Sequence, residues 1–390
     1  MHCGVCGSSD SQIVGFVKEM ALVSAAALPR RAGATVGLGR VALASCGVCG
    51  FIYNSAFDER AMRKAYISAS YALKKPVSAS MSGVLRIVRD KVAPYINDAR
   101  VLEVGSGDSS FSRSIASEAA YLVSVDPACE AVESVAAGCA NWTHMPDFFS
   151  LAAVMDHSAW PFDFAIARHL LEHLPQPARF LRDVYESLAE DGRAYIEVPN
   201  MDEVMDSGRV YDIFHDHVGY FRAGAFEYLC AAAGFTVVDK IGLYGHQHMG
   251  YVLKKVRAGR TLEKACAPDV EHADWGMFTR RVEELNSVVA KISGPVGIWG
   301  AGAHGNATVN YLDEFNRRKV TICFDKDQSK VGRFLQACQA RVVTPTKQSV
   351  ETVQAIVIAA ALHENEIADY LEQLQYRGVV VRTATGVAVT

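Results

Sequence analysis

Hydrophobic and polar positions divide the middle of the chain into short apolar runs separated by glycine-rich or polar turns. Residues 100–116 are consistent with a buried strand, a glycine turn and a helix, and 121–127 with a second strand. A short third strand is expected within 140–150, and 161–200 adds a strand, a loop, a helix, a turn and a fifth strand. Such alternation is typical of an α/β fold with a doubly wound, mostly parallel sheet.

The same pattern returns near the end of the chain. Residues 296–312 predict a strand, a glycine turn and a helix, and 321–327 predict another strand, so a second Rossmann-like unit is expected. Before it, 257–293 has the charged, amphipathic character of a helical linker. The expected division is 1–75, a small N-terminal domain; 76–256, the central α/β domain; 257–293, the linker; and 294–390, the second α/β domain.

Composition narrows the possible partners. The 390 residues are 50% hydrophobic and 21% charged, with a net charge of −4, which suits a globular protein with a substantial core. Lys and Arg are scattered, so no basic surface for nucleic acid is expected. The apolar stretch near the start is too short to cross a bilayer, and the N-terminus lacks the pattern of a signal peptide. We therefore expect a cytoplasmic monomer that binds neither nucleic acid nor membrane.

Four of the ten cysteines form two identical CGVCG motifs. Cys3 and Cys6 make the first pair and Cys46 and Cys49 the second, with 39 residues between the pairs. Two such pairs bring four thiolates to one tetrahedral ion, and the following glycine lets the backbone turn toward it. We expect a closed, structural Zn²⁺ site in a small β-rich domain; two redox motifs or coincidental cysteines are the alternative.

The glycine turn after the first central strand carries the clearest ligand signal. Glu103, Gly105 and Gly107 form E-x-G-x-G, and Asp126 ends the next strand 21 residues after Gly105. Glycines let the turn approach a ligand closely, and an acid at that place suits two ribose hydroxyls. The remaining candidates for binding a nucleoside cofactor are Ser106 in the turn, Asp147 and Phe148 for an adenine edge and face, and His169 after the fourth strand. Together these features resemble class I S-adenosylmethionine (SAM)-dependent methyltransferases; a nucleotide-sugar or NAD fold is the alternative.

A second fingerprint, G-x-G-x-x-G, occupies Gly300, Gly302 and Gly305, with Asp325 ending a strand 25 residues after Gly300. Alone it would indicate an NAD site. A turn that binds another phosphate, or that serves only packing, is at least as plausible from the residues themselves.

Residues 213–221, IFHDHVGYF, place His215, Asp216 and His217 side by side among apolar neighbours. Titratable groups are costly to bury, so this is either a hydrated loop or a place where a proton moves. His169 and His173, one helical turn apart, are further candidates and could instead ligate a metal, although no third ligand is evident from the sequence.

The order of four-cysteine knuckles, methyltransferase core and glycine-rich C-terminal domain resembles the sugar C-methyltransferases of deoxysugar biosynthesis, which contribute to antibiotic pathways. Those enzymes methylate a nucleotide-linked, usually TDP-linked, 4-keto-deoxyhexose at the carbon beside the ketone, normally C3. Their marker, approximately Tyr-His-Glu-His, matches 214–217, and their His-x-x-Glu-His pattern matches 169–173. The C-terminal glycine segment corresponds to a region that cradles the substrate nucleotide rather than NAD.

The resemblance implies roles for individual residues. His217 is the base that forms an enolate, His173 holds or polarises the sugar, and Asp216 orients an imidazole or binds a hydroxyl. SAM is the methyl donor, and His169 lies close to the transferred methyl. The expected substrate-binding residues are Tyr66, Tyr71, His215, Gly302 and His304. For the two tyrosines, simple packing is an equal alternative.

Two positions depart from the family marker. Phe214 stands where relatives have Tyr, and Asp216 replaces Glu, so an altered substrate or proton route is expected. Methylation of oxygen or nitrogen on another small molecule, or binding of SAM or a nucleotide without catalysis, are the competing functions. Neither of these needs a base that forms an enolate.

Overall fold

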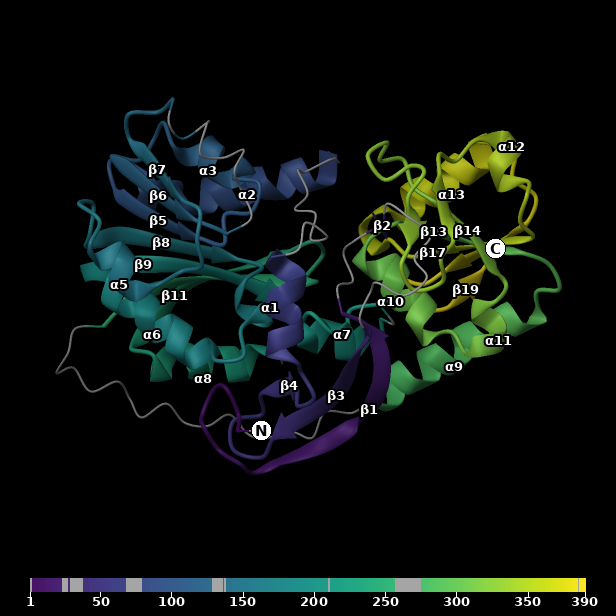
Figure 1. The fold of residues 1–390 in the computed structure, drawn as a ribbon, viewed down its shortest axis with the longest axis horizontal. Helices are drawn as coiled ribbons and strands as arrows, with labels where there is room; N and C mark the ends of the chain where they lie inside the picture. The colour runs from purple at the N-terminus through teal and green to yellow at the C-terminus, as the bar shows by residue number, and fades with distance from the viewer. Residues whose placement is uncertain are drawn as a thin grey trace.

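The computed structural model describes residues 2–22, 27–28, 38–67, 79–127, 136, 138–209, 211–256, 275–384 and 386–390. These residues form three sheets. The central sheet and the C-terminal sheet lie side by side, and the N-terminal sheet lies beneath both (Figure 1). No helix in the described ranges combines the length and apolar character needed to cross a membrane.

The N-terminal sheet is antiparallel, with the strand order β1-β3-β4-β10. Its strands are β1 Ser11–Ala21, β3 Leu38–Cys46, β4 Ile52–Asn54 and β10 Gly219–Tyr220, and the helix α1 Glu59–Ile67 follows β4. The fourth strand thus comes from a segment more than 150 residues further along the chain. This pairing fixes the segment that contains IFHDHVGYF against the N-terminal domain.

The central sheet has the order β11-β12-β9-β8-β5-β6-β7. Its strands are β5 Arg100–Val104, β6 Tyr121–Val125, β7 Trp142–Met145, β8 Phe162–Arg168, β9 Leu188–Pro199, β11 Phe235–Leu243 and β12 His248–Lys255. Strands β5 to β9 pair in parallel, and β12 is antiparallel to both β9 and β11. This is the arrangement of class I SAM-dependent methyltransferases, so the predicted fold class is confirmed, including the closing hairpin.

Helices cover this sheet because each parallel connection must cross a face. The helices are α2 Ala79–Ile96, α3 Ser110–Ile115, α5 Leu151–Met155, α6 Pro177–Ser187, α7 Met201–Ser207 and α8 Ala223–Ala232, with a 3₁₀ turn at Leu171–His173. The 3₁₀ turn follows the carboxyl end of β8 directly. Carboxyl ends of parallel strands are where ligands bind in such sheets.

The C-terminal sheet has the order β19-β18-β17-β13-β14-β16-β15-β2. Its strands are β2 Ala27–Leu28, β13 Val296–Trp299, β14 Val320–Phe324, β15 Phe334–Leu335, β16 Arg341–Val343, β17 Ala355–Ile358, β18 Val379–Arg382 and β19 Ala388–Val389. The helices are α9 Gly276–Lys291, α10 Ala303–Tyr311, α11 Glu314–Arg317, α12 Lys347–Val350 and α13 Glu364–Gln373, with a 3₁₀ turn at Ala361–His363. Five parallel strands at its centre make it the second Rossmann-like unit.

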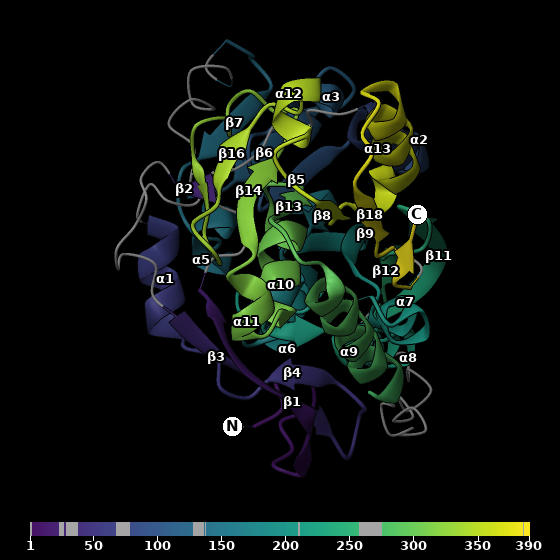
Figure 2. The ribbon, with the colours of Figure 1, turned by 90° about the vertical axis from the view of Figure 1, so that its right-hand side faces the viewer.

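The three sheets exchange segments. Strand β2, from the N-terminal part of the chain, pairs with β15 at the edge of the C-terminal sheet. Of the expected linker, only residues from 275 onward are described, and its helix α9 packs against α7 of the central domain (Figure 2). One hydrophobic core contains Leu43, Ile213 and Tyr311, one from each of the three regions. All three domains therefore contribute to one common hydrophobic core.

We predict that Gly305→Ala destabilises the C-terminal unit. A Cβ at this position would lie 1.9 Å from the carbonyl oxygen of Gly300, so the glycine turn must shift. The free energy of unfolding, measured with a chemical denaturant, should fall by about 1–3 kcal/mol, the usual cost of overpacking. Gly83→Ala is the matched control, because nothing lies within 4 Å of its Cβ position in α2. Equal stability of the two variants would contradict the prediction.

Candidate active site

A cavity of about 620 Å³ opens at the carboxyl ends of β5, β6 and β8. Its floor is the glycine turn, where Gly105 and Gly107 have φ angles of 74° and 56°. The amide of Gly107 donates a hydrogen bond to Oδ2 of Asp126, 2.9 Å away, so the acid at the end of β6 is already oriented toward the turn. Positive φ at both glycines explains why this turn needs residues without a side chain.

Most of the residues expected to bind the cofactor line this cavity. Those on the wall are Gly105, Gly107, Asp126, Asp147, Phe148 and His169. Glu103 and Ser106 are buried behind it: Glu103 accepts a hydrogen bond from the Ser112 hydroxyl, and burial raises its pKa to about 7. Glu103 therefore supports the turn from inside the domain. An acid for ribose hydroxyls, an exposed aromatic ring and close backbone access fit a nucleoside such as that of SAM.

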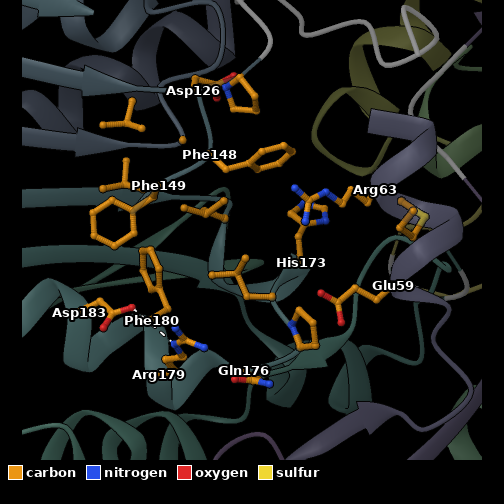
Figure 3. Close-up of a pocket in the computed structure, with 18 of the residues that line it drawn as sticks. Glu59, Arg63, Asp126, Phe148, Phe149, His173, Gln176, Arg179, Phe180 and Asp183 are labelled. Atoms are coloured by element: carbon orange, nitrogen blue, oxygen red, sulfur yellow. Dashed lines mark ion pairs between the residues drawn. The ribbon is translucent and has the colours of Figure 1, made fainter. Parts of the chain in front are cut away.

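The N-terminal domain supplies the opposite wall, which the sequence did not reveal. Glu59 and Arg63 reach into the cavity from α1, facing Asp126 and Phe148 (Figure 3). The Arg63 guanidinium carbon lies 5.3 Å from the centre of the Phe148 ring, a cation–π contact. No spacing along the chain links α1 to the glycine turn, because the contact arises only when the two domains dock.

The two tyrosines expected near this wall remain predictions. The backbone of Tyr66 belongs to α1, and Tyr71 lies outside the described residues. The loop after β8 and the start of α6 contribute further wall residues that the sequence did not single out: Leu174, Pro175, Gln176 and Arg179.

His173 and His217 form one histidine pair at the cavity. His173 lies on the wall, and its ring meets that of His217 edge to face with 4.8 Å between the ring centres. Nδ1 of His173 is 2.7 Å from the carbonyl oxygen of Asp216; because a carbonyl only accepts, this nitrogen carries the proton. Burial lowers the pKa of His173 to about 4 and that of His217 well below its usual value. Both rings are therefore neutral at pH 7.

A second pair consists of His169 and His248, whose ring centres are 4.7 Å apart. His169 has an unusual φ of 51°, and its Nε2 is 2.9 Å from a carboxylate oxygen of Glu197. Glu197 also pairs with Arg168 at 2.7 Å. Burial alone would raise the Glu197 pKa, but the Arg168 charge and the hydrogen bonds from Arg168 and His169 outweigh it and hold that pKa well below its usual range. Sequence reasoning missed Glu197 and His248, since both lie on strands far along the chain.

Neither His217 nor the two residues before it line the cavity. His215 is fully buried against the N-terminal domain, where its ring stacks on Phe57 with 5.4 Å between centres. A Cβ on Gly39 would lie 2.2 Å from this ring, so β3 packs directly on it. Asp216 is 3% exposed, and its carbonyl orients His173. The structure thus brings His173, His217 and Asp216 together and places His215 on the other side of the segment.

Gly302 and His304, the remaining substrate-binding predictions, lie at the start of α10. The His304 ring stacks on that of Tyr211, 4.6 Å away, so the C-terminal glycine turn faces the segment that carries His217. Asp325, the acid expected for an NAD ribose, accepts hydrogen bonds from the Ala301 amide at 2.9 Å and from Lys330 at 2.8 Å. With its carboxylate engaged in this way, it is poorly placed to bind ribose hydroxyls.

The four predicted zinc ligands come together. The Cys3 and Cys49 sulfurs are 3.6 Å apart and those of Cys6 and Cys46 are 3.5 Å apart, with all four within 4.8 Å. Four thiolates about 2.3 Å from a zinc ion lie about 3.8 Å from one another, so the set fits Zn²⁺. The glycines that end the two CGVCG motifs, Gly7 and Gly50, both have positive φ. The first CGVCG motif also contacts the start of α6, where the Ala178 amide donates a hydrogen bond to the Gly4 carbonyl oxygen at 3.4 Å.

Comparison with known proteins bears on the central domain. Residues 79–240 match the family described as "Methyltransferase domain". The match covers less than half of the chain. The chain is also 23% identical over 222 residues to "C-methyltransferase NovU" of Streptomyces niveus, spanning about half of each protein (52% of this chain and 52% of the relative).

Solved structures give weaker likenesses. A didemethyltoxoflavin N1-methyltransferase of Burkholderia thailandensis, solved with S-adenosylhomocysteine, is 18% identical with a TM-score of 0.36, covering 46% of this chain and 80% of that chain. The N-methyltransferase NodS of Bradyrhizobium japonicum is 12% identical with a TM-score of 0.36, covering 50% and 95%. Neither likeness is close enough to carry over a substrate.

We predict that the protein binds one structural zinc ion through the four cysteines. Metal analysis of protein purified without chelators should give one zinc per chain. Cys46→Ser should lower solubility and thermal stability before it affects any chemistry, because loss of a closed site removes folding free energy. Cys230→Ser is a control, since Cys230 is buried in the same core but belongs to neither motif. Stable, soluble protein with no zinc would overturn the assignment.

Proposed function

We propose that the protein is a SAM-dependent C-methyltransferase that acts on a nucleotide-linked keto-deoxysugar, at C3 beside a 4-keto group. The observation that carries this proposal is the neutral His173–His217 pair, in which His173 lies on the wall of a cavity that fits SAM and His217 packs against it. Transfer of a methyl to oxygen or nitrogen does not need a buried base able to remove a proton from carbon. The NovU relative is described as a C-methyltransferase, which agrees with this choice.

The glycine turn and the acids around it hold the cofactor in this proposal. Asp126 binds the ribose hydroxyls, while Asp147 and Phe148 flank the adenine. When bound, SAM supplies an electrophilic methyl group on a positively charged sulfur. His169 lies on the wall of the same cavity, and Arg63 closes it from α1 by its contact with Phe148.

His217 removes the proton beside the ketone, and the resulting enolate carbon attacks the methyl. A general base must be unprotonated at working pH, and the lowered pKa of His217 ensures this. Its ring is held against Phe214, with 4.1 Å between ring centres. Because Phe214 lacks the hydroxyl of the family's Tyr, no relay passes through that position, and the proton needs another exit.

His173 holds the sugar rather than protonating its oxygen. Its Nδ1 proton is committed to the Asp216 carbonyl, so at neutral pH Nε2 can accept a hydrogen bond but cannot donate one. A sugar hydroxyl is the natural donor to such a nitrogen. The polarising role that the family resemblance also allows for His173 requires a protonated ring, which its pKa of about 4 disfavours.

The nucleotide of the substrate binds to the C-terminal unit near Gly302 and His304 in this proposal. These residues face Tyr211 and Asp212, close to the segment that carries His217. Incubation with SAM and TDP-linked or other nucleotide-linked 4-ketosugars tests the whole proposal by mass spectrometry. A gained methyl whose NMR shifts place it on carbon supports the proposal; a methyl on oxygen, or binding without turnover, opposes it.

We predict that Asp126→Ala weakens SAM binding. Loss of charge-assisted hydrogen bonds to the ribose should cost about 1.5–3 kcal/mol, which is roughly 10-fold to 150-fold in Kd measured by titration calorimetry. Asp325→Ala is the matched control in the second glycine fold and should leave SAM affinity unchanged. NAD should show no measurable binding to the unmodified protein; tight NAD binding, or redox activity, would contradict this assignment.

We predict that His217→Asn still binds SAM and the sugar nucleotide but transfers methyl ~10²–10⁴-fold more slowly, as expected when a general base is lost. Exchange of the proton beside the ketone with deuterated solvent, followed by NMR without SAM, should slow in parallel. His173→Asn should also slow exchange, with some loss of sugar binding. Phe214→Tyr should be tolerated. Undiminished exchange in His217→Asn would assign the base to another group.

A further inference from the structure

One buried carboxyl group, that of Glu172, lies between the two histidine pairs. The side chain is 1% exposed, and its Oε1 is 3.8 Å from Nδ1 of His169. On its other side, one ligand atom each of Glu172, His173 and His217 lie within 4.8 Å of one another. At these distances, one water molecule or a small rotation of a histidine ring would connect Glu172 to its neighbours by hydrogen bonds.

The backbone fixes this position. Glu172 occupies the 3₁₀ turn after β8, and its carbonyl accepts a hydrogen bond from Val218 N at 2.7 Å. The segment that carries His217 is therefore tied to Glu172 itself. Meanwhile the second carboxyl oxygen, Oε2, is buried with no hydrogen-bond partner among the described residues. An unsatisfied buried carboxyl oxygen costs free energy, so its retention calls for a function.

The neighbouring hydrogen bonds fix the direction in which a proton can move. Glu197 is kept ionised by Arg168, so the Nε2 of His169 that lies 2.9 Å from it acts as a donor. In the neutral ring this leaves Nδ1, the atom facing Glu172, as an acceptor. His169 itself lines the cavity and has a side chain that is 35% exposed. The arrangement therefore connects the buried His217 ring to His169 on the cavity wall through one carboxyl group.

We propose that Glu172 is a positioning residue for proton relay, which receives the proton that His217 removes from the substrate and passes it to His169. The inference rests on the proposed function. In the first step the substrate C–H bond breaks and an N–H bond forms on His217. That N–H bond then breaks as an O–H bond forms on Glu172, and the O–H proton finally moves to Nδ1 of His169 and from there to solvent.

The electrostatics favour this route. Burial and the neighbouring histidines make a charged His217 ring unstable, whereas burial raises the pKa of Glu172 to about 7. Transfer from an imidazolium to a carboxylate removes both charges from a dry site. It also leaves His217 neutral for the next turnover. Phe214 cannot do this, because it lacks a hydroxyl that could accept and pass on the proton.

The titratable and charged groups that face Glu172 come from every element packed around it. They are His169 and Arg168 at the end of β8, His173 beside it, Glu197 on β9, and Asp216 and His217 on the segment before β10. Of these, Glu197 and Asp216 raise the pKa of Glu172, and His169 lowers it.

The test is the pH dependence of solvent exchange at the carbon beside the ketone. Relay requires ionised Glu172, so exchange by the unmodified enzyme should rise with pH through about 7 and then level off. Glu172→Gln should lose this rise and exchange about 10²-fold more slowly at pH 8, at the low end of what loss of a proton-transfer group costs. Glu172→Asp, which still titrates, should keep the rise at a lower rate. Glu186→Gln, on the exposed face of α6, is the control for lost charge.

A purely structural role for Glu172 would reduce the rate without changing the shape of the pH profile. A Glu172→Gln profile that keeps the rise near pH 7 therefore overturns the proposal. If Glu172→Gln does not fold, the test uses Glu172→Asp instead. A pH-independent exchange rate in folded Glu172→Asp protein also overturns the proposal.

A measurement without substrate separates this inference from the proposed function. With ¹⁵N-labelled histidine, the His169 ring resonances of the unmodified protein should shift with an inflection at about pH 7 as Glu172 ionises. Absence of that inflection overturns the relay. Absence of exchange with every ketosugar nucleotide instead overturns the proposed function, while the histidine titration still reports whether Glu172 and His169 share a proton.

Discussion

The segment between α7 and α8 is the constraint on which the rest of the site depends, because three domains hold its backbone. The Asn54 amide donates to Val218 O at 2.8 Å from the N-terminal sheet, and the Tyr311 hydroxyl donates to Ile213 O at 2.9 Å from the C-terminal unit. The central domain contributes the Nδ1–H of His173, which donates to Asp216 O at 2.7 Å. Each contact uses a main-chain carbonyl, so the position of His217 is set by domain docking and not by its own side chain.

Docking also explains how histidines that would be solvated in a loop become neutral and buried. His217 is 8% exposed because β4 pairs with β10 on one side and α10 packs near the segment on the other. A site that excludes water strengthens hydrogen bonds and disfavours isolated charge. The enolate chemistry proposed above would benefit from both effects, since water would compete for the methyl and for the proton. The C-terminal domain therefore contributes to the burial of His217, in addition to the substrate-binding role proposed for it.

The sequence predicted the parts of this site that are local. The glycine turn with Asp126, the succession of strands and helices in the central domain and the paired CGVCG motifs are contiguous or regularly spaced, so periodicity and turn chemistry suffice to find them. Cavity residues from α1, such as Arg63, have no such signal. The sequence also did not reveal the partners of His169. Glu197 and His248 are 51 residues apart in the chain and come from β9 and β12, which are adjacent strands in the sheet. For His215 the motif gave the residue but not the direction of its ring, because residues 215 and 216 lie in a turn, where the side-chain alternation of a strand does not apply.

The cysteine cluster and the cavity are mechanically connected, which bears on why a small metal domain is present at all. A Cβ on Gly4, inside the first knuckle, would lie 2.5 Å from Pro175 O, and Pro175 lines the cavity. From the other end of the same domain, α1 supplies Arg63 to the Phe148 ring. A domain of this size buries too little hydrophobic surface to hold both contacts rigidly. Four thiolates bound to one metal ion would supply the missing rigidity. On this argument the N-terminal domain contributes one wall of the cavity, and a metal ion bound by the four cysteines would stiffen that wall.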